Sequence, residues 1–316
     1  MRSGSTSASP DIALALTPLH LAQALCVRDP SRPLLLLARQ AAAWSNLLGP
    51  VEGDLWRPVE DRQTVTAAAG RASGAFRVIH AVPWNRTALK LEYAALRSGG
   101  GIDLVDDGVG NYRQAPPWTW RERLKAAGHR AVDGRAYAEW PQRRAGTPGV
   151  VLHGIDPANS LLDPKPRGID PAPLRAAWPA LSRQFEHLAA HRGRPVFFDT
   201  NDVESGWYPY EAKRALLMRL LPRGPVVYFP HPFQQRRLTA DFDNLIDLSG
   251  QTHEWNELAC WYLQPEAVYS AFSSSVMALR WLTGGPVRHV PLHQAFFEAT
   301  GHPSFNVDPN VARMLA

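Results

Sequence analysis

The sequence has little cysteine. Only Cys26 and Cys260 occur among its 316 residues, and each lies inside an apolar run, where a buried thiol is the commonest state. Two cysteines so far apart in the chain do not make a disulfide framework or a cysteine-ligated metal site. We therefore expect a fold held by a hydrophobic core, which a chain of this length with 45% hydrophobic residues can bury.

Long hydrophobic runs are also missing. The most apolar segments, such as LLLLA at 34–38, have the length of a strand and fall far short of the ~18 residues that a membrane span needs. The opening residues, MRSGSTSASP, are small and polar, without the apolar stretch of a signal peptide. These features predict a cytoplasmic protein.

Positive charge is in slight excess, with 34 Lys and Arg against 29 Asp and Glu. A solvated surface is the ordinary interpretation, and attraction to anionic lipid, to an acidic saccharide or to nucleic acid would use the same long-range field. The basic residues occur singly or in pairs, without the interleaved aromatic residues of a groove for single strands. We expect no nucleic-acid partner, and peripheral contact with the anionic face of the inner membrane stays open.

Short apolar runs alternate with amphipathic stretches, which predicts parallel sheets with crossover helices. The pattern occurs twice, before and after a proline-rich passage that begins near residue 156. The expected strands are 12–16, 33–38, 76–80, 102–105, 149–153, 194–198, 225–229 and 287–290, and the expected helices are 19–27, 87–97, 209–221 and 272–282.

The repetition predicts an α/β protein of two Rossmann-like, doubly wound domains, each of ordinary domain size. The expected organisation is a flexible amino terminus at 1–10, a first domain at 11–155, a linker at 156–190, a second domain at 191–300 and a tail at 301–316.

An acidic pair ends one of the predicted strands. In IDLVDDGVGNY, residues 102–112, Asp106, Asp107 and Gly108 follow a strand-like run, and ligands of open parallel sheets bind outside the carboxyl ends of strands. Adjacent carboxylates repel each other, which can raise one pKa toward that of a general base. The alternative is an ordinary Asp-Gly turn.

A histidine between two prolines ends another predicted strand. In VVYFPHPF, residues 226–233, Pro230 and Pro232 restrict the backbone on either side of His231. An imidazole held in this way can protonate or hydrogen-bond a leaving phosphate. A capped or buried structural histidine is the alternative.

Three serines open an apolar helix. Ser273, Ser274 and Ser275 lie where hydroxyls, free backbone N–H groups and the helix dipole favour a bound phosphate. Plain N-capping by one serine explains the same pattern.

The order of these motifs, an acidic-acidic-Gly motif, then His-Pro, then serines, resembles that of the bacterial sialyltransferases and polysialyltransferases. The opening IALALTPLHLAQAL, with Thr17 in its Thr-Pro turn, and the VFFDT strand at 196–200 are also similar to those enzymes. The likeness extends over most of residues 11–290. It departs from the family at 198–202, where related enzymes often carry an apolar-Gln-Pro type of turn.

This resemblance implies a GT-B fold with two domains facing across a cleft, and inversion at the anomeric carbon. The implied donor is a CMP sugar, the acceptor is a saccharide or glycolipid of capsule or lipooligosaccharide, and neither cofactor nor metal is required. Asp106 or Asp107 would be the base and His231 the general acid or phosphate hydrogen-bond donor. The serines at 273–275 and Thr17 would bind substrate, and Gly108 and Pro232 would shape their loops.

The same motifs are compatible with other donors and other classes of protein. The donor sugar can be 3-deoxy-octulosonate, which is also carried on CMP, and a nucleotide-sugar hydrolase or a non-catalytic saccharide- or nucleotide-binding protein could share the fold. Metal-dependent transferases use an Asp-x-Asp signature. The Asp-Phe-Asp triplet at 241–243 lies in a polar segment, where we expect a surface, and we expect Arg280 at the surface as well.

Overall fold

The computed structural model describes residues 11–48, 55–58, 74–81, 86–106, 112, 117–133, 141–271, 273–307 and 309–315. The chain divides into two compact units, Met1–Leu174 and Arg175–Ala316. Each is an α/β unit with one sheet, and every strand pair among the described residues is parallel.

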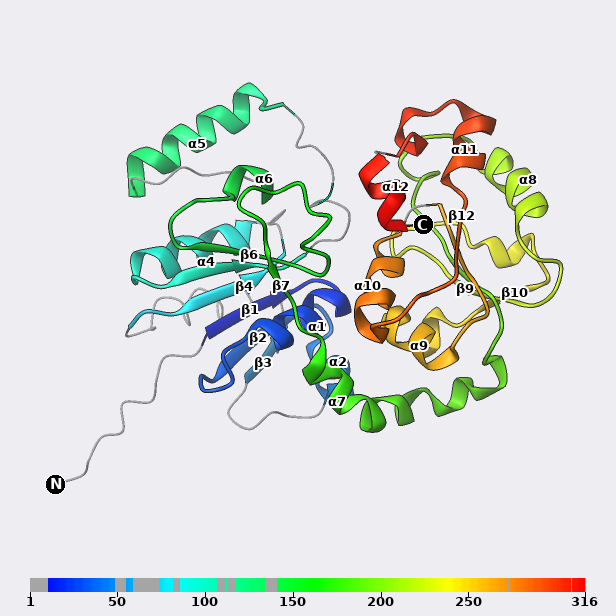
Figure 1. Cartoon of the computed structure of the whole chain (residues 1–316), viewed down its shortest axis with the longest axis horizontal. Helices are drawn as coiled ribbons and strands as arrows, with labels where there is room; N and C mark the ends of the chain where they lie inside the picture. Colours follow the sequence, from blue (N-terminus) through cyan, green and yellow to red (C-terminus); the bar gives the residue numbers. More distant parts are fainter. Residues whose placement is uncertain are drawn as a thin grey trace. The chain divides into compact units, whose positions relative to one another are not determined.

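The first unit contains a seven-stranded sheet of order β3-β2-β1-β4-β5-β6-β7, most of which can be followed from bottom to top in Figure 1. Its strands are β1 (Asp11–Ala15), β2 (Leu34–Ala38), β3 (Leu55–Pro58), β4 (Arg77–His80), β5 (Gly101–Leu104), β6 (Val150–Gly154) and β7 (Arg167–Gly168). Its helices are α1 (Pro18–Val27), α2 (Ala41–Leu48), α4 (Arg86–Arg97), α5 (Trp120–Asp133) and α6 (Pro141–Arg144).

Two neighbouring strands of this sheet, β1 and β2, are almost entirely apolar. Every residue of β1 and β2 is buried, as expected for parallel strands that are covered on both faces. Helix α4 adds Ala88, Leu91 and Ala95 to the core that these strands begin. The chain builds outward from β1 in one direction to β3 and in the other from β4 to β7, so the strand order reverses between β1 and β4.

The second unit repeats this topology with five strands in the order β10-β9-β8-β11-β12. Its strands are β8 (Val196–Phe198), β9 (Val226–Phe229), β10 (Leu245–Asp247), β11 (Val268–Ser270) and β12 (His289–Pro291). Its helices are α8 (Tyr210–Leu220), α9 (Asn256–Leu263), α10 (Ser274–Thr283), α11 (His293–Thr300) and α12 (Pro309–Leu315), with 3-10 segments at Ser182–His191, Leu238–Ala240, Ser249–Gln251 and Pro303–Phe305. The strand order reverses between β8 and β11.

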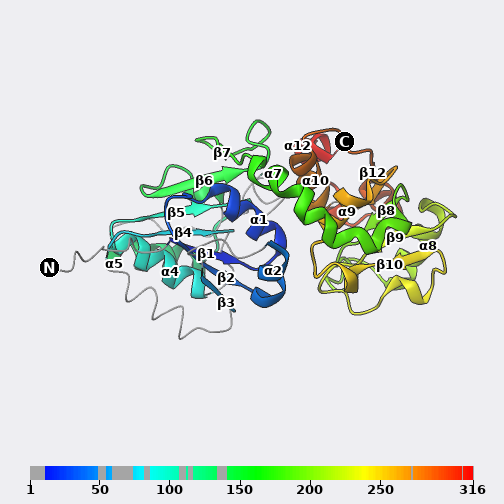
Figure 2. The same ribbon diagram turned by 90° about the horizontal axis from the view of Figure 1, so that it is seen from below.

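Helix α7 (Ala172–Leu181) spans the division between the units and continues into the 3-10 segment Ser182–His191 (Figure 2). Within the second unit, Arg175 Nε donates to the carbonyl of Leu282 at 2.8 Å, and the rings of Trp178 and Trp261 stack with centroids 3.8 Å apart. These contacts fix the greater part of α7 on α9 and α10.

The strands and helices expected from the apolar pattern are confirmed to within two residues at each end. The pattern missed α2, α5, α6, α9 and α11 and the short strands β3, β10 and β11. Cys260 is buried and Cys26 half-buried, both as free thiols, and burial raises the pKa of Cys26 to about 12.

The proline-rich passage is more regular than expected. Residues 156–190, which were expected to form a linker, include β7, α7 and most of the following 3-10 segment. Pro173 lies in the first turn of α7, where no intrahelical N–H bond is lost, and Asp170 Oδ1 accepts the N–H of Ala172 at 2.9 Å. Residues 301–316 likewise contain a 3-10 segment and α12, with Phe305 buried.

Across the described ranges, no helix has both the length and the apolar composition that crossing a membrane requires.

Candidate functional site

The strand order of each sheet marks where a ligand is expected. In open parallel sheets, ligands bind outside the carboxyl ends of the strands at the point where the strand order reverses. In the second unit β8 lies between β9 and β11, and parallel strands all end at the same edge of a sheet. The segments that follow these three strands, which hold residues 199–202, 230–234, and 271 with 273–275, therefore belong to one edge. The sheet brings the His-Pro motif and the serine motif to the same edge of the second unit.

The imidazole of His231 has a defined tautomer. Its Nδ1 accepts the backbone N–H of Phe233 at 3.2 Å, so the proton of the neutral ring lies on Nε2, which can donate to a ligand. Burial lowers the pKa of His231, and the charge of Lys213 lowers it further, whereas Glu204 and Asp202 oppose the shift. At neutral pH His231 is therefore a neutral hydrogen-bond donor. Pro232, beside it, is exposed.

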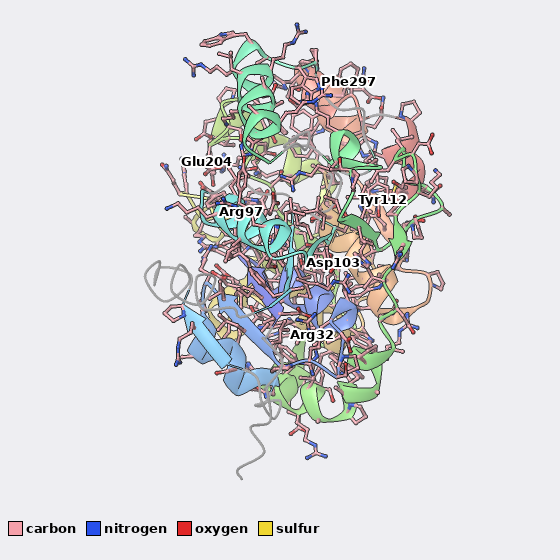
Figure 3. The ribbon with its side chains drawn as sticks, turned by 90° about the vertical axis from the view of Figure 1, so that its left-hand side faces the viewer. Arg32, Arg97, Asp103, Tyr112, Glu204 and Phe297 are labelled. Atoms are coloured by element: carbon pink, nitrogen blue, oxygen red, sulfur yellow. The ribbon has the colours of Figure 1, made fainter. Side chains whose placement is uncertain are left out.

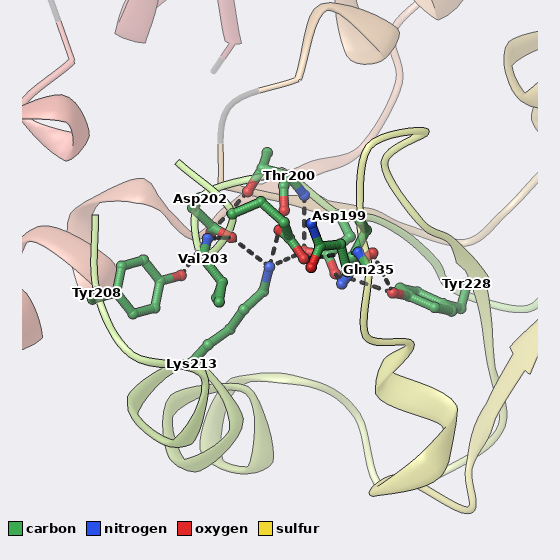
Figure 4. Close-up of polar contacts among 10 residues, drawn as sticks. Asp199, Thr200, Asp202, Val203, Tyr208, Lys213, Tyr228 and Gln235 are labelled. Carbon is green, nitrogen blue, oxygen red and sulfur yellow. Dashed lines mark hydrogen bonds and ion pairs between the residues drawn. The ribbon is translucent and has the colours of Figure 1, made fainter. Parts of the chain in front are cut away.

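A buried lysine lies beneath this edge, between two aspartates of the loop that follows β8 (Figure 4). Lys213 Nζ lies 2.6 Å from Asp199 Oδ1 and 2.5 Å from Asp202 Oδ1, and it donates to the carbonyl of Thr200 at 3.0 Å. Burial acts to lower the pKa of Lys213, but the two carboxylates outweigh burial and raise it. Tyr208 donates to Asp202 Oδ2 at 2.6 Å. The Lys213 ammonium thus occupies the position between the carboxylates that a bound cation would take.

The same network reaches the loop that carries His231. Gln234 Nε2 donates to Asp199 Oδ2 at 2.7 Å, and the hydroxyl of Tyr228 lies 3.1 Å from that oxygen and 2.7 Å from Gln234 Oε1. Within the loop after β9, the backbone N–H of Gln234 donates to the carbonyl of His231 at 2.9 Å. The backbone N–H of Gln235 donates to Glu204 Oε1, in the loop after β8, also at 2.9 Å. The loops after β8 and β9 are held to each other.

The serines divide their roles at the start of α10. Ser273 is the N-cap, and its Oγ accepts the N–H of Ser275 at 3.2 Å, so the capping interpretation is confirmed for this residue. Ser275 Oγ donates to Glu257 Oε1 at 2.7 Å. Ser274 is the first residue of the helix and is half-buried. The helix dipole and the first N–H groups of α10 favour an anion beside these serines.

In the first unit, Asp106 is a buried anchor. It is 0% exposed, and its Oδ2 accepts the hydroxyl of Tyr112 at 2.5 Å and the N–H of Ile155 at 3.2 Å. Tyr112, labelled in Figure 3, accepts the N–H of Asp156 at 3.1 Å through its hydroxyl oxygen. Burial, followed by the charge of Asp106, raises the pKa of Tyr112. Asp106 thereby joins the loop after β5 to the loop after β6, whereas Asp107 and Gly108 lie outside the described residues.

Thr17 follows β1, at the reversal point of the first sheet. Its side chain is exposed and caps α1 by accepting the N–H of His20 at 3.3 Å, with Pro18 in the first turn of the helix. The Thr-Pro turn therefore begins a helix at the edge where a ligand of this unit is expected.

Two other expectations concern surface residues. Asp243 is exposed, but Asp241 is only partly so and accepts from Tyr210 at 2.6 Å and from Arg236 at 2.9 Å. Arg280 was wrongly expected at the surface: it is half-buried and donates to the carbonyl of Met314. The reason is that α12 packs on α10 near the end of the chain, a contact that no local pattern indicates.

Sequence reasoning missed the buried charges. In the first unit, Asp103 accepts from His153 at 2.7 Å, and Glu92 lies 2.7 Å from His80 and is paired with Arg144. In the second unit it missed Lys213. The one available signal was the pair of aspartates in FDTND, immediately after a predicted strand, at the point where the chain departs from the family pattern.

No protein-family model matches this chain, and comparison with curated proteins finds no similar sequence.

Proposed function

We propose that this chain is an inverting, metal-independent glycosyltransferase of the GT-B type. It moves sialic acid, or a related ulosonic acid, from a CMP-activated donor to a saccharide acceptor during synthesis of capsule or lipooligosaccharide. The observation that carries the proposal is the meeting of the His231 loop and the serine-capped α10 at one edge of the second sheet, next to its reversal point.

The donor side of the reaction belongs to this edge. As the bond between the anomeric carbon and the CMP phosphate breaks, negative charge grows on the phosphate. His231 Nε2–H is a donor for that charge, and the N-terminus of α10 with Ser273 and Ser274 supplies further dipoles. Pro232 restricts the His231 loop. These groups stabilise the leaving group without a cation.

The acceptor side belongs to the first unit. A carboxylate takes the proton of the acceptor hydroxyl as its oxygen bonds to the anomeric carbon. Both oxygens of Asp106 are buried, and Oδ2 is engaged by Tyr112 and Ile155, which fits a residue that positions the turn. We therefore assign the base to Asp107. Gly108 is assigned to shaping the loop of this motif, and Thr17 to substrate binding.

The test is a transfer reaction. The purified protein would be incubated with CMP-sialic acid and, separately, with CMP-3-deoxy-octulosonate, over a panel of glycan acceptors, with and without EDTA. CMP release and glycan mass would be followed. EDTA-resistant transfer that His231→Ala lowers by on the order of a hundredfold or more supports the proposal, and His187→Ala, which changes an exposed histidine of the same unit, is the matched control.

The alternatives give different results. A hydrolase would release CMP and free sugar at the same rate with or without acceptor. A binding protein would hold the CMP sugar and release no CMP. Either result across a broad acceptor panel would remove the transferase proposal, and the donor that is turned over would identify the sugar.

A further inference from the structure

Helix α5 begins with a well-formed capping box. Thr119 Oγ1 accepts the N–H of Glu122 at 3.3 Å, and Glu122 Oε2 accepts the N–H of Thr119 at 2.6 Å. One side of the helix faces the rest of the first unit: the ring of His129 stacks on Tyr93 with centroids 4.6 Å apart, and Arg143 donates to Glu122 Oε1 at 3.1 Å. The helix therefore has a fixed inner side, and Figure 1 shows it at the periphery of the unit, beyond α4 and α6.

The outer side of α5 presents apolar side chains to solvent. Trp120 is 66% exposed and Leu124 is 62% exposed. Ala127 and Ala131 are exposed as well and continue the same row, since spacings of four, seven and eleven residues return to one face of a helix. A Cβ added at Gly128, beside this row, would meet nothing within 4 Å. The apolar row is thus uncovered along its length.

Positive charges border this row on both sides. At 100° per residue, Arg121 and Lys125 lie along one flank, and Arg123 and Arg130 lie along the other. All four are exposed, and the guanidinium of Arg121 lies 5.4 Å from the centroid of the Trp120 ring. The outer half of α5 is therefore an apolar stripe between two basic borders, with the acidic Glu122 turned to the inner side.

We propose that the outer face of α5 binds the surface of an anionic phospholipid bilayer, with the helix lying in the plane of the interface. Helices with this pattern bury the apolar stripe at the boundary of head groups and acyl chains while the basic borders meet the lipid phosphates. Tryptophan suits that boundary because its ring is large and apolar and its N–H remains near water. A protein partner fits less well. The area that two large side chains on one short helix can bury is far smaller than the ~800 Å² that each partner buries in a stable interface.

The role of this lipid binding rests on the proposed function: it would bring the enzyme to a glycolipid acceptor. Lipid binding itself needs no sugar transfer. The two proposals can therefore fail separately.

The experiment is co-sedimentation of the full chain with vesicles of phosphatidylcholine, alone or with about one third phosphatidylglycerol. Trp120→Ala/Leu124→Ala removes the stripe, and Arg123→Gln/Arg130→Gln removes one border. Arg219→Gln/Arg223→Gln, which takes two exposed charges from the second unit, is the matched control. Circular dichroism and thermal unfolding establish that each variant is folded, as expected for changes at exposed positions.

The wild type should bind the phosphatidylglycerol vesicles, bind those of phosphatidylcholine alone much less, and lose binding as salt is added. Loss of one border should lower the partition coefficient by on the order of twentyfold, loss of the stripe by about tenfold or more, and the control by less than fivefold. The proposal is overturned if the stripe variant binds as the wild type does or if the control loses as much as the border variant. It is also overturned if the face joins two copies of the chain, seen as a dimer in sedimentation velocity that the stripe variant abolishes.

A readout of transfer then separates the two proposals. The stripe variant should keep its activity toward a soluble acceptor and lose it toward a glycolipid embedded in the anionic vesicles. Vesicle binding without transfer to any acceptor would support the lipid surface and count against the transferase.

Discussion

The side-chain amide of Gln234 donates to Asp199 at 2.7 Å, which ties the loop of His231 to the loop that follows the neighbouring strand. Asp199 is itself paired with the buried Lys213. His231 thus acquires its position from a network that begins inside α8, even though the imidazole is at the edge of the sheet. We expect Gln234 and Lys213 to be positioning residues for the proposed reaction.

Replacing Gln234 should affect transfer more than stability. In Gln234→Ala, Asp199 keeps Lys213 and Tyr228, so we expect a loss of about 1 kcal/mol in the free energy of unfolding. Transfer should fall by about tenfold or more in kcat because the His231 loop is released. Gln235→Ala is the control, because it leaves the bond from Gln234 to Asp199 in place and Gln235 bonds to Glu204 through its backbone N–H. Equal kinetics for the two variants would count against a positioning role.

Replacing Lys213 should destabilise the second unit. Lys213→Met keeps the length of the side chain but leaves Asp199 and Asp202 buried without their cation, so we expect a loss of about 3–5 kcal/mol in urea unfolding. Adding Asp199→Asn should recover part of this loss. Lys90→Met, at an exposed position, should change stability by no more than about 0.5 kcal/mol. NMR titration should also show the pKa of His231 rising in Lys213→Met, because the charge of Lys213 lowers it.

Replacing each aspartate of the acidic motif in turn should have different effects on stability and on transfer. Asp106→Asn weakens the bonds from Tyr112 and Ile155, so the free energy of unfolding should fall by about 1–3 kcal/mol. Asp107→Asn should abolish transfer, by on the order of a hundredfold or more, without a comparable loss of stability. Full activity in Asp107→Asn, with loss confined to Asp106→Asn, would move the base to Asp106.

The serine at the start of α10 allows capping to be separated from phosphate binding. Ser273→Ala should cost about 1 kcal/mol of stability through loss of the N-cap. Ser273→Asp and Ser273→Asn both keep a cap, but the aspartate repels a phosphate at the same helix terminus. The donor KM should therefore rise well above the wild-type value in Ser273→Asp and change little in Ser273→Asn. The same KM in both variants would leave Ser273 with capping alone.

The pH dependence of stability should depend in part on Glu92. Burial acts to raise its pKa, but Arg144 and His80 outweigh burial and hold the pKa below its ordinary value of 4.5. A lowered carboxyl pKa stabilises the fold above 4.5, and this stabilisation is lost as the pH falls through the folded-state pKa. Glu92→Gln should be less stable than the wild type by about 3 kcal/mol at pH 7, and the difference should shrink below pH 4.5. Urea unfolding as a function of pH measures it, with Glu186→Gln at an exposed position as control.

Local sequence patterns were enough to predict most of the longer strands and several of the helices. Alternating apolar runs predicted the main strands and helices, because a buried parallel strand needs a nearly continuous apolar run. Capping by one of the serines at 273–275 was also weighed from the sequence, since an N-cap acts within three residues of itself. The three-residue strands β10 and β11 were missed because so few residues carry little periodicity, whereas β8 and β12, of the same length, lie in the longer runs expected at 194–198 and 287–290.

Only the tertiary structure decided which polar residues are buried together. Lys213 reads as a surface lysine of α8, yet it lies inside because β8 ends beside that helix and supplies Asp199 and Asp202. Arg280 and Asp106 are fixed in the same way by Met314 and Tyr112. The energy of a buried charge depends on partners that are distant in the chain, so its sequence neighbours do not specify it. The sequence by itself determined where the apolar strands lie along the chain and which residues follow each of them. The folded sheets decided which strands are neighbours, and therefore which of those residues lie together.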